Sequence, residues 1–354
     1  MNKFYDLPLA RDYVRHWGLT EAIRELLQNA IDSDSPLEYA FHGDTLSITS
    51  RFTTLEAKTL ILGCTSKADD KEKIGSFGEG YKLALLVLTR LGYSAQVLNG
   101  NKVWTPSFVY SELFGADLLR LTEEDCGDNQ GLTFLIKGLA HEDSNRIRES
   151  CLFMQPPMTD VIGTLYGSIL PSRPGQLYVG GLLVTTTDST YGYDIKPEHL
   201  KLERDRQTVT DWDLYWLTKD MWLDTKRWAD IATMMEAQVP DVKSIQYDCP
   251  EILKEVCYQK FKEENPGAIA VSSQKELEAV VAKGMVKTVY VESGSYHFAV
   301  STAKEHRDTY IQHMRAQTPA EIIAEWLSKY QREMRHPIRI AFQQLLKAAE
   351  LWKA

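Results

Sequence analysis

Apolar residues recur at helical spacing in two stretches near the beginning of the chain. The first stretch predicts a helix over residues 19–32, in which the apolar positions form one stripe. The second predicts a helix over residues 81–91, where Gly92 is a natural C-terminal stop. A shorter helix is expected over residues 55–62. Such helices need a second layer of structure to cover their apolar stripes.

Strand-like alternation supplies that second layer. Residues 45–49, 94–98 and 133–136 alternate apolar and polar side chains with the period of a strand. The simplest packing is one helix layer on a mixed, mostly antiparallel sheet, which is an α+β fold. We therefore predict a first domain of this kind over residues 1–145.

The pattern changes beyond residue 159. Residues 177–179 and 182–186 predict the two strands of a hairpin joined at Gly180-Gly181. A tryptophan-rich helical stretch is expected over residues 211–236. We assign these elements to a second α+β domain over residues 150–245.

A small α/β unit is predicted near the end of the chain. A strand, a helix and a strand are expected at residues 268–272, 274–283 and 287–291, without a phosphate-binding glycine pattern in the first turn. Helices are expected to follow. We assign residues 250–354 to this third region, and a length of 354 residues agrees with two or three domains of about 100–200 residues.

The composition narrows the class of protein. Hydrophobic residues make up 44% of the chain and charged residues 25%, which argues against a disordered or fibrous chain. The formal net charge of −9 argues against a strong sequence-independent nucleic-acid binder, which carries a basic face. The five cysteines are scattered without zinc spacing, so we expect reduced thiols. Without a signal pattern or an apolar run of about 18 residues, we expect a cytoplasmic protein with no membrane partner.

Polar side chains on the first predicted helix suit chemistry. Glu25, Asn29 and Asp32 stand at positions i, i+4 and i+7, which places them on one stripe nearly opposite the apolar one. The helix can therefore bury one face and offer two carboxylates and a carboxamide on the other. Taken alone, this spacing is more typical of a solvated polar face.

A glycine-rich stretch opens the second predicted helix. Gly75, Gly78 and Gly80 let backbone N–H groups approach an anion, and the helix N-terminus adds its positive dipole end. This arrangement predicts a phosphate seat, and a flexible loop is the alternative because such a glycine pattern is weak by itself. Upstream, the stretch Gly63–Lys67 offers hydroxyls and a lysine that suit a lid over phosphates.

In this order and spacing, the residues resemble the GHKL superfamily, which includes gyrase B subunits, MutL, MORC proteins, a heat-shock chaperone and the histidine kinases. The stretch Glu25–Asp32 looks like the family's acidic helix. Thr65-Ser66-Lys67 looks like the lid motif of the MutL and MORC branches, and Ile74–Gly80 looks like the second glycine box. Gly131–Phe134 loosely resembles the Gly-Thr strand beside the adenine pocket. The resemblance covers under half of the chain and implies a Bergerat-type α/β sandwich.

The resemblance implies a role for each matching residue. Glu25 would orient and activate the attacking water, and Asn29 would hold the Mg²⁺ ion that bridges the phosphates. The backbone N–H groups of Gly78 and Gly80 would bind phosphate. The other residues implied at the nucleotide site are Asp32, Ser50, Thr65, Ser66, Lys67, Gly75, Lys82 and Thr133. The implied cofactors are ATP and Mg²⁺.

The chain departs from the family at the adenine-reading position. Where the family has Asp-x-Gly-x-Gly after its first strand, this chain has the stretch Thr49–Leu55, which lacks the aspartate and both glycines. Ser50 stands in the place of the aspartate, and a hydroxyl discriminates adenine less well than a carboxylate does. The base preference and the occurrence of hydrolysis therefore stay open, with Asp32 and Thr133 as further candidates to contact the base.

A basic loop in the predicted second domain extends the resemblance. The hairpin and the segment after it resemble the transducer domain of the gyrase, MutL and heat-shock-chaperone branches, in which a basic residue reaches the terminal phosphate. Lys201, Arg204 and Arg206 are the residues implied for that catalytic role. The alternative for this segment is a charged surface loop with local ion pairs.

The sequence thus favours a slow Mg²⁺-dependent ATPase that works as a conformational switch, with a nucleotide-dependent homodimer as a further expectation. A nucleotide-responsive scaffold without useful turnover is the alternative, which the missing Asp-x-Gly-x-Gly favours. A histidine kinase is least favoured, because only the weak His141-Glu142 resembles a phosphoacceptor pattern. A protein or DNA partner and the biological process stay open.

Overall fold

The structure, a computed structural model, divides into two compact units, Met1–Asp213 (unit 1) and Leu214–Ala354 (unit 2). It describes residues 2–33, 35–61, 80–127, 131–200, 211–284, 286–315, 317, 319–330 and 333–348. Helices and sheets both occur, which confirms the predicted α+β class. The division at residue 213 falls inside the segment predicted as the second domain, and the three-domain division stays a prediction.

Unit 1 is built on a seven-stranded sheet. Its strands are β1 (Lys3–Ala10), β2 (Leu37–His42), β3 (Thr45–Ser50), β4 (Ser94–Asn99), β5 (Lys102–Ser111), β6 (Ala116–Asp125) and β7 (Leu132–Lys137). Their order across the sheet is β1-β6-β5-β4-β7-β3-β2. Each pairing between these described strands is antiparallel, whereas the sequence predicted a mixed, mostly antiparallel sheet.

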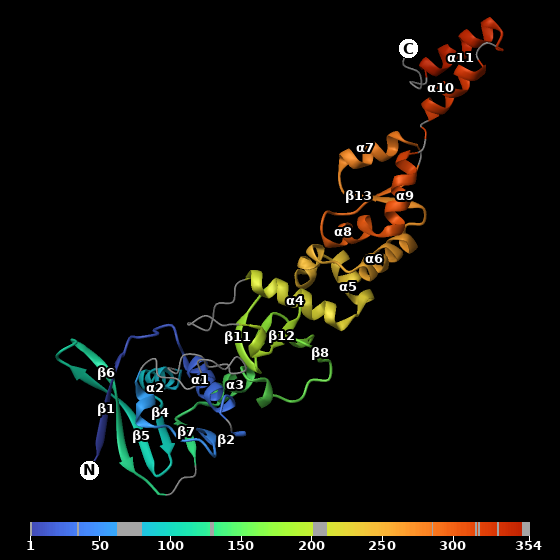
Figure 1. Ribbon diagram of the computed structural model, residues 1–354. Coiled ribbons are helices and arrows are strands. Elements are labelled where there is room, and N and C mark those ends of the chain that lie inside the picture. Colours follow the sequence, from blue (N-terminus) through green and yellow to red (C-terminus); the bar gives the residue numbers. More distant parts are fainter. Residues whose placement is uncertain are drawn as a thin grey trace. The chain divides into compact units, whose positions relative to one another are not determined.

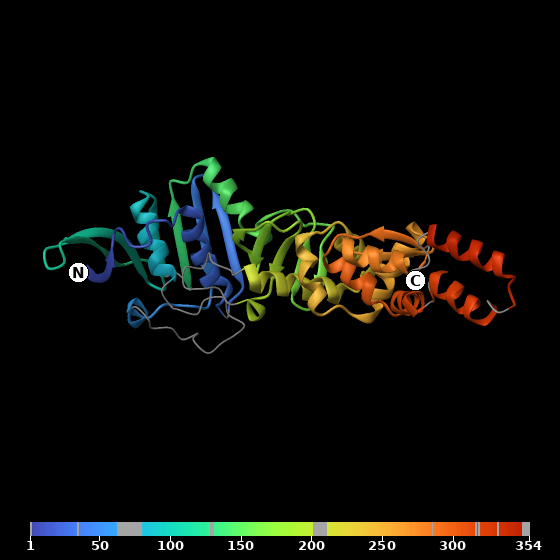
Figure 2. The same cartoon turned by 90° about the horizontal axis from the view of Figure 1, so that it is seen from above.

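Three helices share a hydrophobic core with this sheet (Figures 1 and 2). They are α1 (Leu19–Ile31), α2 (Gly80–Arg90) and α3 (His141–Glu149). Leu26 of α1, Leu85 of α2 and Ile48 of β3 are at most 1% exposed in this core. The first two helices confirm the helical periodicity in the sequence, whereas residues 55–62 form only the 3-10 helix η1 (Ala57–Leu60).

The register of β3 decides which side chains face the helices. Leu46 and Ile48 are fully buried. Thr45, Ser47 and Thr49, which alternate with them, are half-buried on the opposite face. Ile48 stands opposite Phe134 of β7, and Ser50 stands opposite Leu132. Ser50 and Leu132 therefore lie on the helix-covered face.

The sequence analysis missed β1, β2, β5 and β6. Charged side chains interrupt the apolar alternation of these strands. Several of these side chains form ion pairs with a neighbouring strand. In β6, Arg120 binds Asp6 of β1, with Nε 2.6 Å from Oδ1. In β5, Lys102 binds Asp125 of β6. These ion pairs cannot be recognised in the sequence until the pairing of the strands is known.

Gly131 directly precedes β7 and has a φ of +99°. A Cβ atom at this position would lie 2.3 Å from the carbonyl oxygen of Arg51. Both the backbone conformation and the close approach of the chain after β3 therefore require glycine here.

A five-stranded sheet follows in unit 1. Its strands are β8 (Ile162–Thr164), β9 (Gly167–Leu170), β10 (Gln176–Val179), β11 (Leu182–Thr186) and β12 (Gly192–Ile195), with the 3-10 helices η2 (Leu152–Met154) and η3 (Pro197–His199) before and after them. The order is β11-β10-β12-β9-β8. The predicted hairpin is confirmed, because β10 and β11 are antiparallel and join at Gly180-Gly181. β10 and β12 are parallel.

Unit 2 is mainly helical. Its elements are α4 (Asp211–Thr225), which starts at the unit boundary, α5 (Trp228–Glu236), η4 (Pro240–Tyr247), α6 (Glu251–Glu264), β13 (Ala268–Val271), α7 (Gln274–Ala282), β14 (Lys287–Tyr290), α8 (Ser295–Thr302), α9 (Lys304–Arg315), α10 (Pro319–Tyr330) and α11 (His336–Ala348). The predicted strand-helix-strand unit is confirmed, with β13 and β14 parallel. Ile269, Val271 and Val280 form a small core there.

The helical stretch predicted over residues 211–236 is two helices. α4 ends at Thr225, and Lys226 has φ of +55°. A residue in the left-handed region ends a helix, as glycine commonly does. No glycine marks this break in the sequence.

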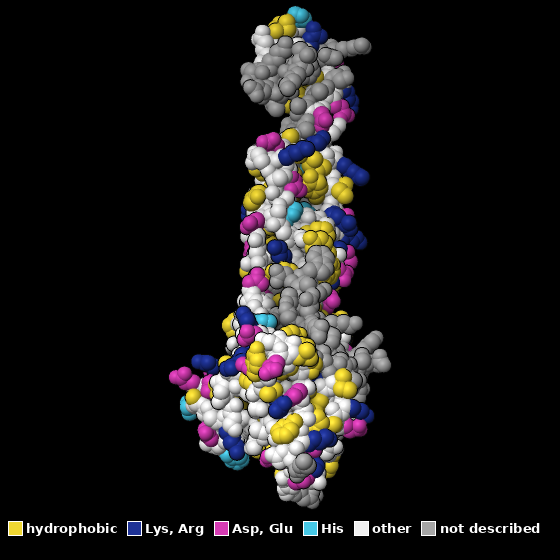
Figure 3. All heavy atoms as spheres, turned by 90° about the vertical axis from the view of Figure 1, so that its left-hand side faces the viewer, with side chains coloured by type: hydrophobic (Ala, Val, Ile, Leu, Met, Phe, Trp, Pro, Cys, Tyr) yellow, Lys and Arg dark blue, Asp and Glu magenta, His cyan; other side chains and the backbone are white. Residues whose placement is uncertain are grey.

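Among the described residues, no helix is long and apolar enough to cross a membrane. On the face drawn in Figure 3, acidic and basic side chains of the described residues are interspersed. A mixed surface of this kind differs from the single-sign basic face of a protein that binds nucleic acid through phosphate charge alone.

Candidate functional site

Helix α1 is buried on nearly all sides, which the sequence did not predict. Glu25 has an exposed fraction of 0% and Asp32 of 5%, whereas Asn29 is half-buried. The stripe of polar side chains opposite the apolar one therefore does not face bulk solvent. Burying a carboxylate is costly, so a wholly buried glutamate in a helix needs a specific reason.

Glu25 and Asn29 make contacts within α1. The Nδ2 atom of Asn29 donates to the backbone oxygen of Glu25 at 2.7 Å, within the helix. This bond commits the amide nitrogen, so the Oδ1 oxygen is the atom suited to a metal ion. The Nη2 atom of Arg24 lies 3.9 Å from Oε1 of Glu25.

The structure brings Ser50 to the C-terminal end of α1. The hydroxyl of Ser33 lies 2.6 Å from the carbonyl oxygen of Ala30 and 3.3 Å from the hydroxyl of Ser50. Ser33 directly follows Asp32, the C-cap residue of α1. Asp32 and Ser50 therefore belong to one buried corner between α1 and β3.

Thr133 lies on the other face of the sheet. Its hydroxyl is 3.0 Å from that of Thr49, the residue directly opposite it in β3. Because side chains alternate between faces along a strand, Thr133 and Ser50 point to opposite sides. The structure thus does not bring these two predicted base-contacting residues together.

Asn99 at the end of β4 was missed by the sequence analysis. Its Oδ1 accepts from the backbone N–H of Leu55, and its Nδ2 donates to the backbone oxygen of Leu55, both at 2.8 Å. Leu132 stands opposite both Asn99 and Ser50, so the three residues form a row across three strands on the helix-covered face. Asn99 thereby fixes the segment after β3. An asparagine at a strand end is too common a turn residue to reveal this role by itself.

Lys82 lies on α2, directly after Gly80 and Tyr81, and its side chain has an exposed fraction of 0%. Its ammonium donates to the backbone oxygens of Thr59 at 2.7 Å and Ile61 at 2.8 Å. The hydroxyls of Tyr81 and Thr59 lie 3.0 Å apart, and burial raises the pKa of Tyr81 to about 12. These bonds anchor the start of α2 to the segment around η1.

Gly80 is the first residue of α2 and the last of the glycine-rich stretch. The other predicted loop residues, Thr65, Ser66, Lys67, Gly75 and Gly78, lie outside the described residues. The predicted basic residues Lys201, Arg204 and Arg206 also lie outside them. Of the predicted site, the structure therefore describes the α1 residues, the ends of β3 and β7, and the start of α2.

No group of three His, Cys, Asp or Glu side chains that could hold a metal ion occurs in the described part of the chain. Mg²⁺ keeps several waters and takes one or two protein oxygens together with substrate phosphates. A single Asn29 oxygen fits such a site.

Comparison with known proteins identifies a relative but no activity. No protein-family model matches the chain. A Mycoplasma pneumoniae protein described as uncharacterized is 23% identical over 227 residues, which span 59% of this chain and 92% of that protein. The functional argument therefore rests on the residues of the site.

Proposed function

We propose that unit 1 binds Mg·ATP in a GHKL-type site of a Bergerat fold and hydrolyses it slowly as a conformational switch. One observation supports the proposal: the helix that carries Glu25 and Asn29 packs against the helix that Gly80 begins. Glu25 and Asn29 lie on α1, Gly80 ends the glycine-rich stretch at the start of α2, and these two helices pack side by side. A phosphate at the N-terminus of α2 would lie beside the polar residues of α1.

The residues divide the work of phosphoryl transfer. The N-terminus of α2 supplies backbone N–H groups and a positive dipole end for the phosphates. The Oδ1 atom of Asn29 is the protein ligand for Mg²⁺, which neutralises phosphate charge when bound. Glu25 accepts the proton of a water as that water attacks the γ-phosphorus, and the bond to the bridging oxygen breaks to give ADP and phosphate. Burial of Glu25 keeps its carboxylate in one orientation for this step.

The switch would act through the segments that the family resemblance assigns to the lid and the transducer. Thr65, Ser66 and Lys67 belong to the lid, and Lys201, Arg204 and Arg206 belong to the basic loop. In this proposal, ATP gathers both segments over the phosphates and promotes homodimerisation, and hydrolysis reverses these steps.

A second function, nucleotide-dependent scaffolding without useful turnover, is favoured by two observations. Ser50 replaces the adenine-reading aspartate and is already contacted by Ser33 at 3.3 Å. Lys82 is fully buried and donates to the backbone oxygens of Thr59 and Ile61. Fewer groups then remain to hold the base and the phosphates.

The test is calorimetric titration of Mg·ATP, Mg·ADP and Mg·GTP into wild type and Glu25→Gln, with phosphate release measured in parallel. Glutamine keeps the volume of this buried side chain, so the substitution changes the charge without leaving a cavity. We expect micromolar ATP binding in both proteins and a loss of turnover of about 10²-fold or more in Glu25→Gln. Glu142→Gln, an exposed acid on α3, is the matched control and should match wild type.

Each alternative gives a different result. Tight nucleotide binding without phosphate release in wild type would favour the scaffold. Equal turnover in Glu25→Gln and wild type would remove Glu25 from the reaction. No nucleotide binding in any of the proteins would contradict both functions.

A further inference from the structure

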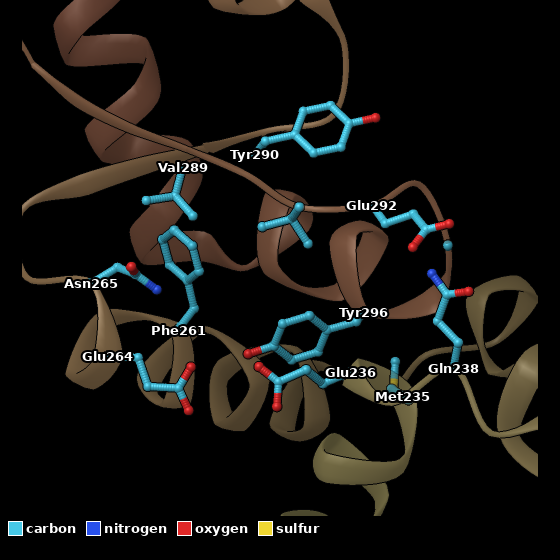
Figure 4. Close-up of a pocket in the computed structure, with 12 residues that line it drawn as sticks. Met235, Glu236, Gln238, Phe261, Glu264, Asn265, Val289, Tyr290, Glu292 and Tyr296 are labelled. Atoms are coloured by element: carbon cyan, nitrogen blue, oxygen red, sulfur yellow. The ribbon is translucent and has the colours of Figure 1, made fainter.

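Unit 2 contains a pocket of about 240 Å³ that the nucleotide proposal does not use (Figure 4). The ends of α5 and α6 form one part of its wall, and β14 and the start of α8 form the other. Residues far apart in the sequence therefore converge on one hollow within a single unit.

The pocket is negatively charged. Glu236 of α5, Glu264 of α6 and Glu292 after β14 line it, and the described lining residues include no lysine, arginine or histidine. Behind the wall, Nζ of Lys260 lies 3.0 Å from Glu236 and 2.8 Å from Glu264. One lysine offsets part of this charge and fixes two of the carboxylates in place. The third carboxylate belongs to an exposed residue, Glu292.

Aromatic rings supply the rest of the recognition surface. Phe261 and Tyr296 are 2% and 6% exposed and line the pocket, whereas the ring of Tyr290 lies on the other side of β14 from Val289 (Figure 4). The Tyr296 hydroxyl donates to the backbone oxygen of Cys257 at 3.3 Å, which fixes that ring. Burial and the charges of Glu236 and Glu264 raise the pKa of Tyr296, so this phenol stays neutral. Neutral rings beside carboxylates are the setting in which organic cations bind.

We propose that this pocket binds a small organic cation, an ammonium or guanidinium group on a short alkyl chain. The carboxylates supply the charge, and the rings of Phe261 and Tyr296 supply cation–π contacts. The volume is below the range of about 300–1,000 Å³ of pockets for drug-sized ligands, so it suits a head group rather than a large molecule. The cation comes either from a free amine or from an arginine or lysine side chain of a peptide.

The test is calorimetric titration of the full chain with agmatine, with acetyl-Gly-Arg-Gly-amide, and with the same peptide carrying neutral citrulline. We expect both cations to bind. The citrulline peptide should bind at least about tenfold more weakly than the arginine peptide. Glu292→Gln should weaken cation binding about fivefold, the factor expected for loss of one partly exposed charge contact. Glu263→Gln, an exposed acid on the same helix as Glu264, should leave binding unchanged.

Tighter binding of agmatine indicates a free amine, and tighter binding of the arginine peptide indicates a side chain of a partner; both support the proposal. Equal binding of the citrulline peptide would overturn it, as would binding that Glu292→Gln leaves unchanged. No binding of either cation at about 10 mM would also overturn it. None of these outcomes depends on nucleotide binding in unit 1.

Discussion

Lys82 holds a positive charge where its side chain has no contact with solvent. Its two hydrogen bonds to the backbone oxygens of Thr59 and Ile61 offset part of the cost of burying an ammonium group. Thr59 lies in η1 and Ile61 directly follows it, so the bonds join η1 to α2. At the scale of single residues, this lysine acts as an anchor for the fold.

We expect Lys82→Met to lower the free energy of unfolding of unit 1 by about 2–4 kcal/mol, because two backbone carbonyl oxygens would lose a charged donor. The measurement is urea unfolding followed by circular dichroism. Lys137→Met, at an exposed position at the end of β7, is the control and should change stability by less than about 0.5 kcal/mol. If Lys82→Met kept its stability but lost ATP affinity, Lys82 would bind phosphate, as the sequence predicted, and would not anchor the fold.

The sequence places Glu25 and Asn29 correctly on one helix, because helical periodicity depends only on local spacing. It could not place Ser50 and Thr133 relative to each other. In strands, a shift of one residue in register exchanges the two faces, and register is set by the pairing of distant segments. The fully buried state of Glu25 was likewise hidden, since it depends on packing around the whole of α1.

At the scale of elements, the break between α4 and α5 shows how a helix ends without glycine or proline. Lys226 takes the left-handed conformation, and the N–H of Trp228 donates to its backbone oxygen at 2.9 Å. This conformation costs a residue with a side chain about 1–2 kcal/mol. The stretch was predicted as continuous because its helix-forming residues run on through the break.

Lys226→Gly should therefore stabilise unit 2 by about 0.5–1 kcal/mol, since glycine adopts this conformation without a steric penalty but loses more backbone entropy. Thermal unfolding followed by calorimetry measures the change. Lys226→Ala keeps the penalty and removes the long side chain, so it should give no such gain. A glycine variant no more stable than the alanine variant would refute this account of the break.

At the scale of the whole molecule, the chain has two compact units, and each contains a described hydrophobic core. Leu26 belongs to the core of unit 1, and Ile269 belongs to the small core in unit 2. The sequence predicts the elements of each unit better than the boundary at residue 213, because no run of glycine, proline or serine marks that position. The boundary between the units depends on contacts between segments that are distant in the sequence. Local sequence patterns carry no information on these contacts.

Two unfolding transitions are therefore expected in calorimetry. Leu26→Ala should destabilise one of them by about 2–5 kcal/mol, and Ile269→Ala should destabilise the other by a similar amount. Mg·ATP should raise only the transition that Leu26→Ala lowers, because a ligand stabilises the unit to which it binds. A single transition shifted by both variants would instead mean that the chain unfolds as one cooperative body.

The close approach at Gly131 has a consequence for how this protein can evolve. Every substitution there introduces a Cβ atom that would meet the Arg51 carbonyl at 2.3 Å. In descendants that keep this close approach between the end of β3 and the start of β7, selection should retain glycine at position 131. Nearby surface codons remain free to drift. Gly131 thus becomes a fixed reference point by which remote relatives of this chain can be aligned even when the residues around it have diverged.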